Sequence, residues 1–275
     1  MKRTLWIDGI AVWSPHLAGW PAAQAALSGQ AVSAGEPAAR PAPALLAANE
    51  RRRAPDAVLL ALEVATQALA ASGHAAADVA TVFSSAHGDL AVTDALCRTL
   101  AADPLLLSPT RFHHSVHNAA SGYWAIGSGS HAASTALSAF EHSFAAGLLE
   151  AASQCQADAQ PVMLVAYDTE ACGALASVNR SRGLLALALV LAPGAGPRSR
   201  WALHWSLQAT AVAPPALRSP AAQALAGNAS ALALPLLEAL ARGQDATLAW
   251  PLSAALSLQI ALQRLPSAAE GGAAA

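Results

Sequence analysis

The stretch TALSAFEHSFAAGLLEAA, residues 135–152, decides the fold. A short, partly apolar run meets a sharp bend, and a helix pattern begins directly after it, near Ser143. Several enzyme folds place their nucleophile at such a bend between a strand and a helix. The corner itself, residues 140–143, reads Phe-Glu-His-Ser. The question is therefore which of these four side chains, if any, carries chemistry.

Strand patterns alternate with helix patterns on both sides of this stretch. Strands are expected at 4–13, 79–86, 162–168, 182–194 and 201–210, and helices at 55–73, 89–102, 117–127 and 143–153. The run RGLLALALVLAPG, residues 182–194, is apolar on both faces, which is typical of a strand in the middle of a sheet that is covered on both sides. This alternation predicts an α/β protein with a central sheet between helices.

The pattern becomes weaker after Val212. One helix is expected at 232–242, ended by Gly243, and two short strands at 246–250 and 256–262. We therefore divide the chain into a main domain, residues 1–212, and a reduced C-terminal segment, residues 213–275. The end of this segment, residues 265–275, is interpreted as a loose tail.

Two segments ahead of the first long helix are predicted as loops. Residues 29–47 are rich in proline, alanine and glycine. Residues 50–53, with the sequence ERRR, form the one dense charge run, and we interpret it as a solvated loop.

The composition indicates a globular protein with a large apolar interior. Hydrophobic residues make up 55% of the 275 positions and charged residues 12%, so the chain can bury a large core and also an apolar partner face. The net charge is −2 and Lys2 is the only lysine, which argues against nucleic-acid binding. The longest apolar run, residues 184–192, is too short for a membrane helix of about 20 residues, and the N-terminus does not read as a signal peptide. We therefore expect a cytoplasmic protein without a membrane span.

Neither a metal site nor a cofactor site is indicated. The three cysteines, at positions 97, 155 and 172, are widely spaced and form no CxxC pair. The histidines of RFHHSVH, residues 111–117, are loosely spaced and lack a cysteine or HExxH partner. Ser138 and Ser143 stand outside a GxSxG context, which does not favour a serine hydrolase.

The order of these pieces resembles the central part of a β-ketoacyl synthase, most specifically over residues 107–168. A Ser-Pro turn at 108–109 precedes a helix with the spacing NxxxGxxxI, and an Ala-Ser pair at 133–134 precedes the strand, the bend and the next helix. The resemblance extends, mostly as pattern, over about residues 4–210. It implies a thiolase-like, layered α-β-α fold that consists mainly of the N-terminal half, with a reduced C-terminal part.

The departures from the family bear directly on catalysis. When Ser134 is laid on the serine of the family motif, Glu141 falls where the condensing cysteine stands. In the family, two catalytic histidines lie in a Gly-Thr-Gly motif and a Gly-His motif of the second half, and the second half of this sequence contains neither motif. The segment VAYDTE, residues 165–170, replaces a glycine pair. The resemblance therefore implies that no catalytic residue is present, and Glu141 is interpreted as an anion at a helix N-terminus.

Two segments, 115–126 and 143–151, are most similar to short β-ketoacyl synthase-like N-terminal domain proteins, the chain length factors found near aryl polyene gene clusters. This resemblance implies a non-catalytic subunit of a heterodimer with a cysteine-bearing ketosynthase. Such a subunit shapes the acyl tunnel while a polyene, polyketide or fatty-acid-like chain is extended on an acyl carrier protein.

The same resemblance assigns roles to two groups of residues. Leu107, with its neighbours Leu106 and Phe112, is expected to form the gate at the end of the acyl tunnel. The dimer interface is expected to contain His114, Asn118, Gly122, Tyr123 and Trp124. Ordinary internal packing is the alternative for Leu107 and for the two aromatic residues.

Two other functions remain open from the sequence. The first is a stand-alone malonyl-carrier-protein decarboxylase or acyltransferase that uses Glu141 and His142. The second is a structural homodimer.

Overall fold

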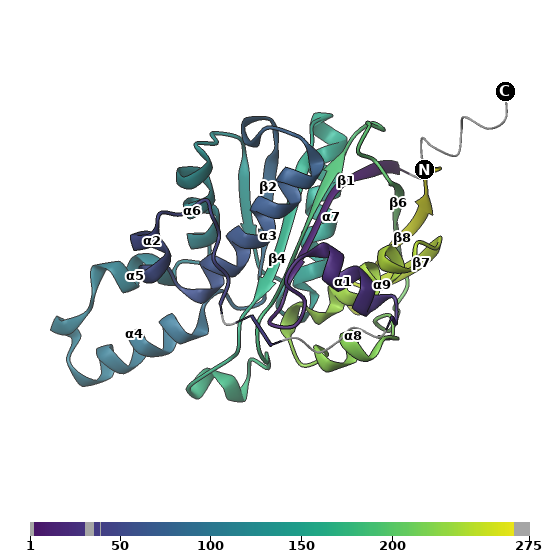
Figure 1. The fold of residues 1–275 in the computed structure, drawn as a ribbon. Helices are drawn as coiled ribbons and strands as arrows, with labels where there is room; N and C mark the ends of the chain where they lie inside the picture. The colour runs from purple at the N-terminus through teal and green to yellow at the C-terminus, as the bar shows by residue number, and fades with distance from the viewer. Residues whose placement is uncertain (1–2, 31–35, 39, 267–275) are drawn as a thin grey trace, which may run out of the picture.

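The computed structural model describes residues 3–30, 36–38 and 40–266. These residues form one eight-stranded sheet in the order β3-β2-β4-β5-β1-β6-β8-β7 (Figure 1). The strands are β1 Arg3–Trp13, β2 Ala80–Ser84, β3 Ser134–Leu137, β4 Val162–Asp168, β5 Leu185–Ala192, β6 Trp201–Gln208, β7 Ala246–Pro251 and β8 Ser257–Arg264. Part of the loop expected at 29–47, and most of the tail expected at 265–275, lie outside the described residues.

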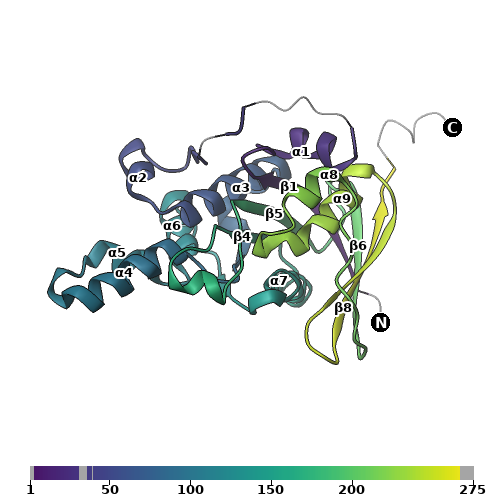
Figure 2. The same cartoon turned by 90° about the horizontal axis from the view of Figure 1, so that it is seen from below.

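Helices cover both faces of this sheet, α3 and α6 on one side and α7 and α9 on the other (Figures 1 and 2). The α-helices are α1 Trp20–Leu27, α2 Ala48–Arg53, α3 Asp56–Ser72, α4 Leu90–Ala102, α5 Pro109–Ser115, α6 Ala119–Ser128, α7 Ser143–Asp158, α8 Pro220–Ala224 and α9 Leu234–Arg242. Short 3-10 turns are η1 Ala76–Asp78, η2 Pro104–Leu106, η3 Phe140–His142, η4 Ala174–Ser177 and η5 Ala229–Ala233. No helix in the described part of the chain combines the length and the hydrophobicity needed to cross a membrane.

The central strand β5 shows how the sequence pattern specifies these layers. All eight of its residues are buried, as its two-sided hydrophobicity predicts. Leu187 and Leu189 point into the core on the α7 side, whereas Ala188 and Val190 point into the core on the α3 side. The predicted layered α/β fold is confirmed.

The strand directions bring three loops together at one edge of the sheet. β2 pairs in parallel with both β3 and β4, whereas β5 is antiparallel to its two neighbours. The C-terminal ends of the three parallel strands therefore lie side by side, and the bend after β3 stands next to the loops that follow β2 and β4. This edge is where α/β sheets commonly place their functional groups.

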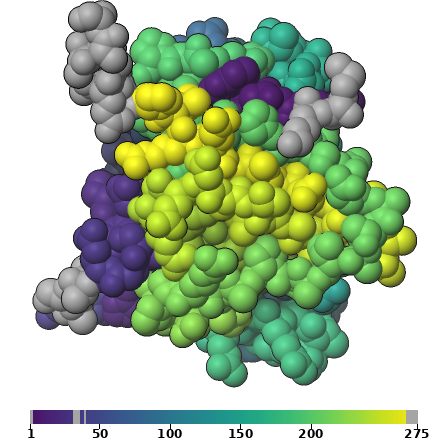
Figure 3. Space-filling model, turned by 90° about the vertical axis from the view of Figure 1, so that its right-hand side faces the viewer, coloured from purple at the N-terminus to yellow at the C-terminus, as the bar shows by residue number. Residues whose placement is uncertain are grey.

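The C-terminal segment completes the same sheet. β6 pairs with β1 through residues 201–205, β8 pairs with β6 along its whole length, and β7 pairs with β8. Trp250 of β7 packs edge-on against Phe144 of α7, with ring centroids 5.6 Å apart. Figure 3 shows these residues, in green to yellow, as one continuous surface beside the purple N-terminal residues.

One predicted loop is wrong. The run at 50–53 belongs to helix α2 rather than to a solvated loop. The guanidinium of Arg51 donates hydrogen bonds to the backbone carbonyls of Pro43 and Leu46, at 3.3 and 2.7 Å. This short helix is therefore fixed by its arginine to the preceding turn, and the charge pattern alone did not reveal that contact.

Candidate functional site

The bend between β3 and α7 is held by a serine at each side. Ser138 Oγ donates to the carbonyl of Ala86, in the loop after β2, at 2.9 Å. Ser143 Oγ donates to the carbonyl of Phe140 at 2.7 Å and accepts from the amide of Ala139 at 3.0 Å. The corner is therefore a closed, hydrogen-bonded turn from which α7 starts at Ser143, as the sequence predicts.

The backbone at this corner is strained at Phe140. Its φ of 52° lies in the left-handed region, which costs a non-glycine residue about 1–2 kcal/mol. Such outliers cluster at functional sites because the surrounding structure must hold them. The position predicted to replace the nucleophile, Glu141, is the next residue, so it stands on the strained corner.

Glu141 and His142 do not form a shielded acid–base pair. The Glu141 side chain is 74% exposed, and its Oε1 lies 3.7 Å from Nε2 of His142. Nδ1 of His142 is buried and has no hydrogen-bond partner within the described residues. The exposed carboxylate suits a solvated charge at the positive end of α7, which stabilises it by about 0.3–1 kcal/mol.

A cavity of about 530 Å³ opens beside the corner, and we call it the bend pocket. It is lined by Ala86, His87, Phe140, Glu141, His142, Val178, Arg180, Pro214, Ala229, Leu232 and Pro251. The His87 ring packs edge-on against Phe140 at 5.5 Å, and its burial lowers the pKa of this imidazole. The wall combines residues from before and after position 212, so the C-terminal segment is needed to complete it.

None of the three cysteines stands at this corner. Cys155 is fully buried on α7, donates to the carbonyl of Leu191 at 3.6 Å, and burial raises the pKa of its thiol to about 12. Cys97 is exposed on α4, and Cys172 lies in the loop after β4, where burial and nearby Asp94 raise its pKa. The corner therefore lacks a thiol that could form a thioester.

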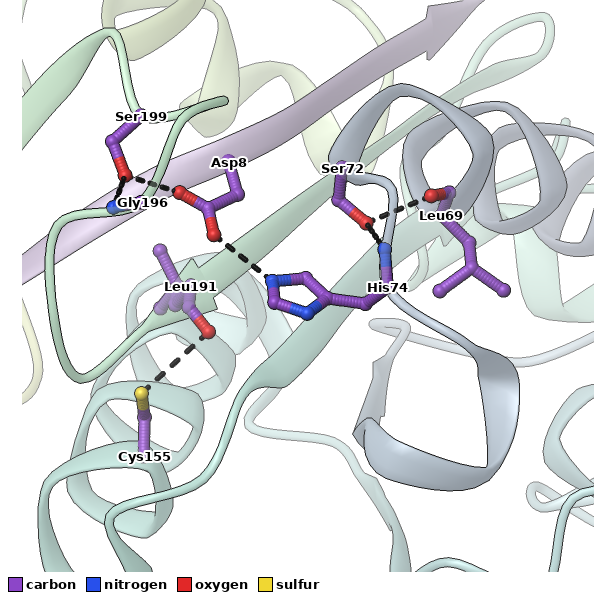
Figure 4. Close-up of polar contacts among 8 residues, drawn as sticks. All are labelled: Asp8, Leu69, Ser72, His74, Cys155, Leu191, Gly196 and Ser199. Atoms are coloured by element: carbon purple, nitrogen blue, oxygen red, sulfur yellow. Dashed lines mark hydrogen bonds and ion pairs between the residues drawn. The ribbon is translucent and has the colours of Figure 1, made fainter.

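A serine, a histidine and an aspartate meet elsewhere in the fold, between β1, the end of α3 and the loop before β6 (Figure 4). Asp8 accepts from Ser199 Oγ on one oxygen, at 2.5 Å, and pairs with His74 Nε2 on the other, at 2.9 Å. A hydrolase triad requires the histidine between the serine and the aspartate. Here the aspartate is in the middle and Ser199 accepts from the amide of Gly196, so the cluster ties three segments together.

The predicted gate residues lie on an arm that extends from the sheet. This arm consists of α4, η2 and α5, residues 90–115 (Figure 1). Leu106 is 72% exposed and Phe112 is 63% exposed, whereas Leu107 is half-buried. They are near one another but do not line the bend pocket.

The residues predicted for the interface occupy several environments around α6. Asn118 and Gly122 are exposed, and Tyr123 is half-buried. His114 is buried and pairs through Nε2 with the Tyr123 hydroxyl at 2.9 Å, and burial lowers the pKa of this imidazole. The histidine is therefore already bonded within its own chain.

The prediction that Trp124 contributes to the dimer interface is corrected, because this side chain is buried within its own chain. Only 2% of this residue is exposed, because it packs into the core between α6 and α3. The exposed aliphatic residue of α6 is Ile126, at 84%. It borders a groove of about 460 Å³ that also contains Leu45 and Val116. Ile126 is the last position of the NxxxGxxxI spacing described above. From the sequence, only helical spacing could indicate that this side chain is exposed.

Comparison with known proteins identifies related folds. The family model for the β-ketoacyl synthase N-terminal domain matches residues 20–251. No curated protein sequence matches the chain.

The solved structures that are similar to this chain include ketosynthase complexes. A chain of the ketosynthase (ApeO) in complex with its chain length factor (ApeC) from Xenorhabdus doucetiae has 24% identity and a TM-score of 0.71, covering 95% of this chain and 99% of that one. A chain of the AntDE:AntF complex, a ketosynthase with a type II polyketide acyl-carrier protein, has 11% identity and a TM-score of 0.73, covering 96% and 100%. A chain of the ishigamide ketosynthase/chain length factor has 15% identity and a TM-score of 0.66, covering 96% and 100%. At these identities the similarity establishes the thiolase-like ketosynthase fold.

Proposed function

This chain belongs to the β-ketoacyl synthase N-terminal domain family, and we propose that it is the non-catalytic, chain-length-determining subunit of a heterodimeric ketosynthase. Its partner is a cysteine-bearing ketosynthase, and the pair extends a polyene or polyketide chain on an acyl carrier protein. Each of the complexes AntDE:AntF, ApeO–ApeC and ishigamide ketosynthase/chain length factor contains a ketosynthase, and two contain a named chain length factor, which supports this assignment.

The observation that carries the proposal is the corner without a thiol. A condensing enzyme forms a thioester through a cysteine thiolate, which a helix N-terminus helps to stabilise. Here the helix N-terminus is present at Ser143, but the side chain beside it is the carboxylate of Glu141. The one cysteine of the helix that follows, Cys155, is buried and has a raised pKa. The corner thus keeps the framework of a nucleophile site but lacks its reactive group.

The surface around β3 supports a protein partner. β3 ends the described sheet and pairs only with β2, so its other edge has unpaired backbone groups that a second chain can bond. Beside it, Ile126 and the small residue Gly122 present an exposed, closely approachable face of α6. An apolar face of this kind is typical of a subunit interface.

The gate role requires only shape. Leu106 and Phe112 are apolar and exposed on the arm, so they can close a cavity that belongs mainly to a partner. Burying one more methylene contributes about 0.8 kcal/mol, or about fourfold in binding. A side chain that blocks the last position therefore limits chain length without taking part in catalysis.

Reconstitution with the ketosynthase that co-purifies with this chain tests the proposal. We expect product only when both subunits are present, and the product length should follow the side chain at the gate. Leu107→Ala should yield longer products and Leu107→Trp shorter ones, as measured by mass spectrometry. Leu207→Ala, at an exposed position on β6, is the matched control and should leave the length unchanged. Unchanged lengths for both Leu107 variants would reject the gate.

The same preparation separates the other two functions. A decarboxylase using Glu141 and His142 releases CO₂ from malonyl-carrier protein without a partner, whereas the proposed subunit does not. A structural homodimer forms a stable pair of identical chains and does not retain a ketosynthase during purification.

A further inference from the structure

A buried carboxylate lies under the bend pocket, at a position where the family resemblance expects a glycine. Asp168 is the last residue of β4 and is 2% exposed. It belongs to the segment VAYDTE, which departs from the glycine pair of the related family. A carboxylate placed there must find hydrogen-bond donors, because burial without them is costly.

Its two oxygens bond to two different parts of the chain. Oδ1 accepts from Ser85 Oγ at 2.8 Å and from the amide of Ala86 at 2.9 Å, both in the loop after β2. Oδ2 accepts from Ser230 Oγ at 2.7 Å, in η5 of the C-terminal segment. The carboxylate therefore joins the loop after β2 to η5.

A second contact at the same place does not depend on this carboxylate. The Asn228 amide donates to the backbone carbonyls of Asp168 and Gly183, at 3.1 and 3.2 Å. Since these acceptors are backbone groups, their bonds do not change when a side chain gains or loses a proton. We call these contacts of Asp168 and Asn228, between β4, the loop after β2 and η5, the joint. The Asp168 carboxylate is its ionisable group.

This joint supports the wall of the bend pocket. Ala86, which bonds to the carboxylate, and Ala229, which adjoins Ser230, both line the cavity. The carbonyl of Ala86 also accepts from Ser138 at the strained corner. Separation of η5 from the loop would therefore widen the pocket.

We propose that Asp168 is a proton-linked latch, which stays closed when the carboxyl holds its proton and opens more readily when the proton is lost. In the closed state the carboxylate is shielded from water. Opening lets water solvate the charge, so the ionised form gains more from opening than the neutral form does. The latch would adjust the bend pocket to pH, and it does not depend on the chain-length role proposed above.

The burial that sets this direction also sets the pH range in which the latch responds. Burial raises the pKa of Asp168 to about 6, although the bonds from Ser230, Ser85 and Ala86 lower it. A hydrated aspartate has a pKa of about 3.9, so protonation favours the closed state and its advantage is lost as pH rises from about 4 to about 6. A difference of about two units corresponds to at most about a 100-fold change in the opening constant.

Other ionisable groups surround the joint. Burial and the Asp168 charge raise the pKa of the adjacent Tyr167, which therefore stays neutral throughout this range. His87 lies in the bonded loop, and burial lowers its pKa. His117 pairs with the Ser85 carbonyl at 3.1 Å, and Asp89 begins the next helix. Because His87 lies in the same loop that Asp168 binds, the test must isolate Asp168.

Hydrogen exchange of the full chain between pH 4.5 and 7.5, corrected for intrinsic rates, measures this opening. We expect amides at 85–90 and 225–233 to open more as pH rises, by up to about 25-fold over this range, with a plateau above pH 7. Asp168→Asn should remove the pH dependence. Glu238→Gln, which changes another buried carboxylate outside the joint, should retain it.

Ser230→Ala provides a second, independent test. Its hydroxyl lowers the pKa of Asp168, so its loss should move the midpoint of opening to higher pH. The proposal is overturned if opening at the two segments does not depend on pH, if it decreases with pH, or if Asp168→Asn retains the dependence. An unshifted midpoint in Ser230→Ala also overturns it, even if Asp168→Asn does not fold.

Discussion

The contact between Phe144 and Trp250 joins the helix of the bend to the C-terminal segment. Phe144 is 3% exposed at the start of α7, and Trp250 is fully buried on β7. Their rings pack edge-on at 5.6 Å, and the indole donates to the Leu232 carbonyl at 2.8 Å. We therefore predict that Phe144→Ala destabilises both parts together.

The expected loss follows from burial and from the ring pair. Replacing a buried phenylalanine by alanine costs about 3–5 kcal/mol. The edge-on pair supplies about 0.5–1.5 kcal/mol beyond its buried area. With about 2–4 °C for each kcal/mol in a chain of this size, the melting temperature of Phe144→Ala should fall by roughly 6–20 °C.

Urea unfolding followed by circular dichroism and tryptophan fluorescence measures this loss. The two signals should report one transition in the wild type, because both parts share a core. A double-mutant cycle of Phe144→Leu with Trp250→Leu should give a coupling of about 0.5–1.5 kcal/mol. Leu207→Ala, on the exposed end of β6, should change stability by less than about 0.5 kcal/mol. A loss below about 1 kcal/mol for Phe144→Ala, or separate transitions for the two parts, would refute the shared core.

Three further predictions concern the surface and the corner. Ile126→Arg should weaken binding of the ketosynthase by roughly 10- to 150-fold, because burying an isoleucine contributes about 1.5–3 kcal/mol. Calorimetry measures this affinity, and the melting temperature of the variant should equal that of the wild type. Glu141→Gln should lower stability by less than about 1 kcal/mol and leave product length unchanged in the reconstituted pair, whereas a loss of product would assign Glu141 to the reaction. Iodoacetamide should label the exposed Cys97 and spare Cys155 in the folded protein, because the Cys155 thiol is buried and has a pKa of about 12. Peptide mass spectrometry locates the label, and a label on Cys155 would contradict its burial.

The sequence predicts the fold well where one pattern dominates. Strand 162–168 has the predicted bounds, and the helix predicted at 55–73 is observed as Asp56–Ser72, ended by a left-handed Gly73. On α4, Asp94 Oδ2 and Arg98 Nη2, one helical turn apart in the sequence, lie at 2.6 Å. These features are local, so hydrophobic period and capping residues specify them.

Short helices were missed for a physical reason. α5 was interpreted as a proline-marked turn, although Ser108 accepts from the amide of Arg111 and Pro109 stands at the first helical position. α1 likewise begins after Gly19, with a proline near its start. Helices of one or two turns give too few positions for a hydrophobic period, so the capping residues are the only signal.

The long-range features could not be derived from local patterns. The pairing of β8 with β6 and the position of Ser230 against Asp168 connect segments about 50 to 60 residues apart in the chain. The corner itself was predicted, but its strain at Phe140 was not, because an aromatic residue at positive φ contradicts its own backbone preference. The sequence contains one indication of the proposed latch, namely the aspartate, Asp168, that ends the apolar strand 162–168.

The location of the acyl group during chain extension tests the central claim most directly. The reconstituted pair is incubated with loaded carrier protein, and the intact mass of each subunit is measured during turnover. We expect the acyl adduct on the ketosynthase and none on this chain. An adduct on this chain, together with elongation by the isolated protein, would contradict the assignment of a subunit that shapes the product without forming it.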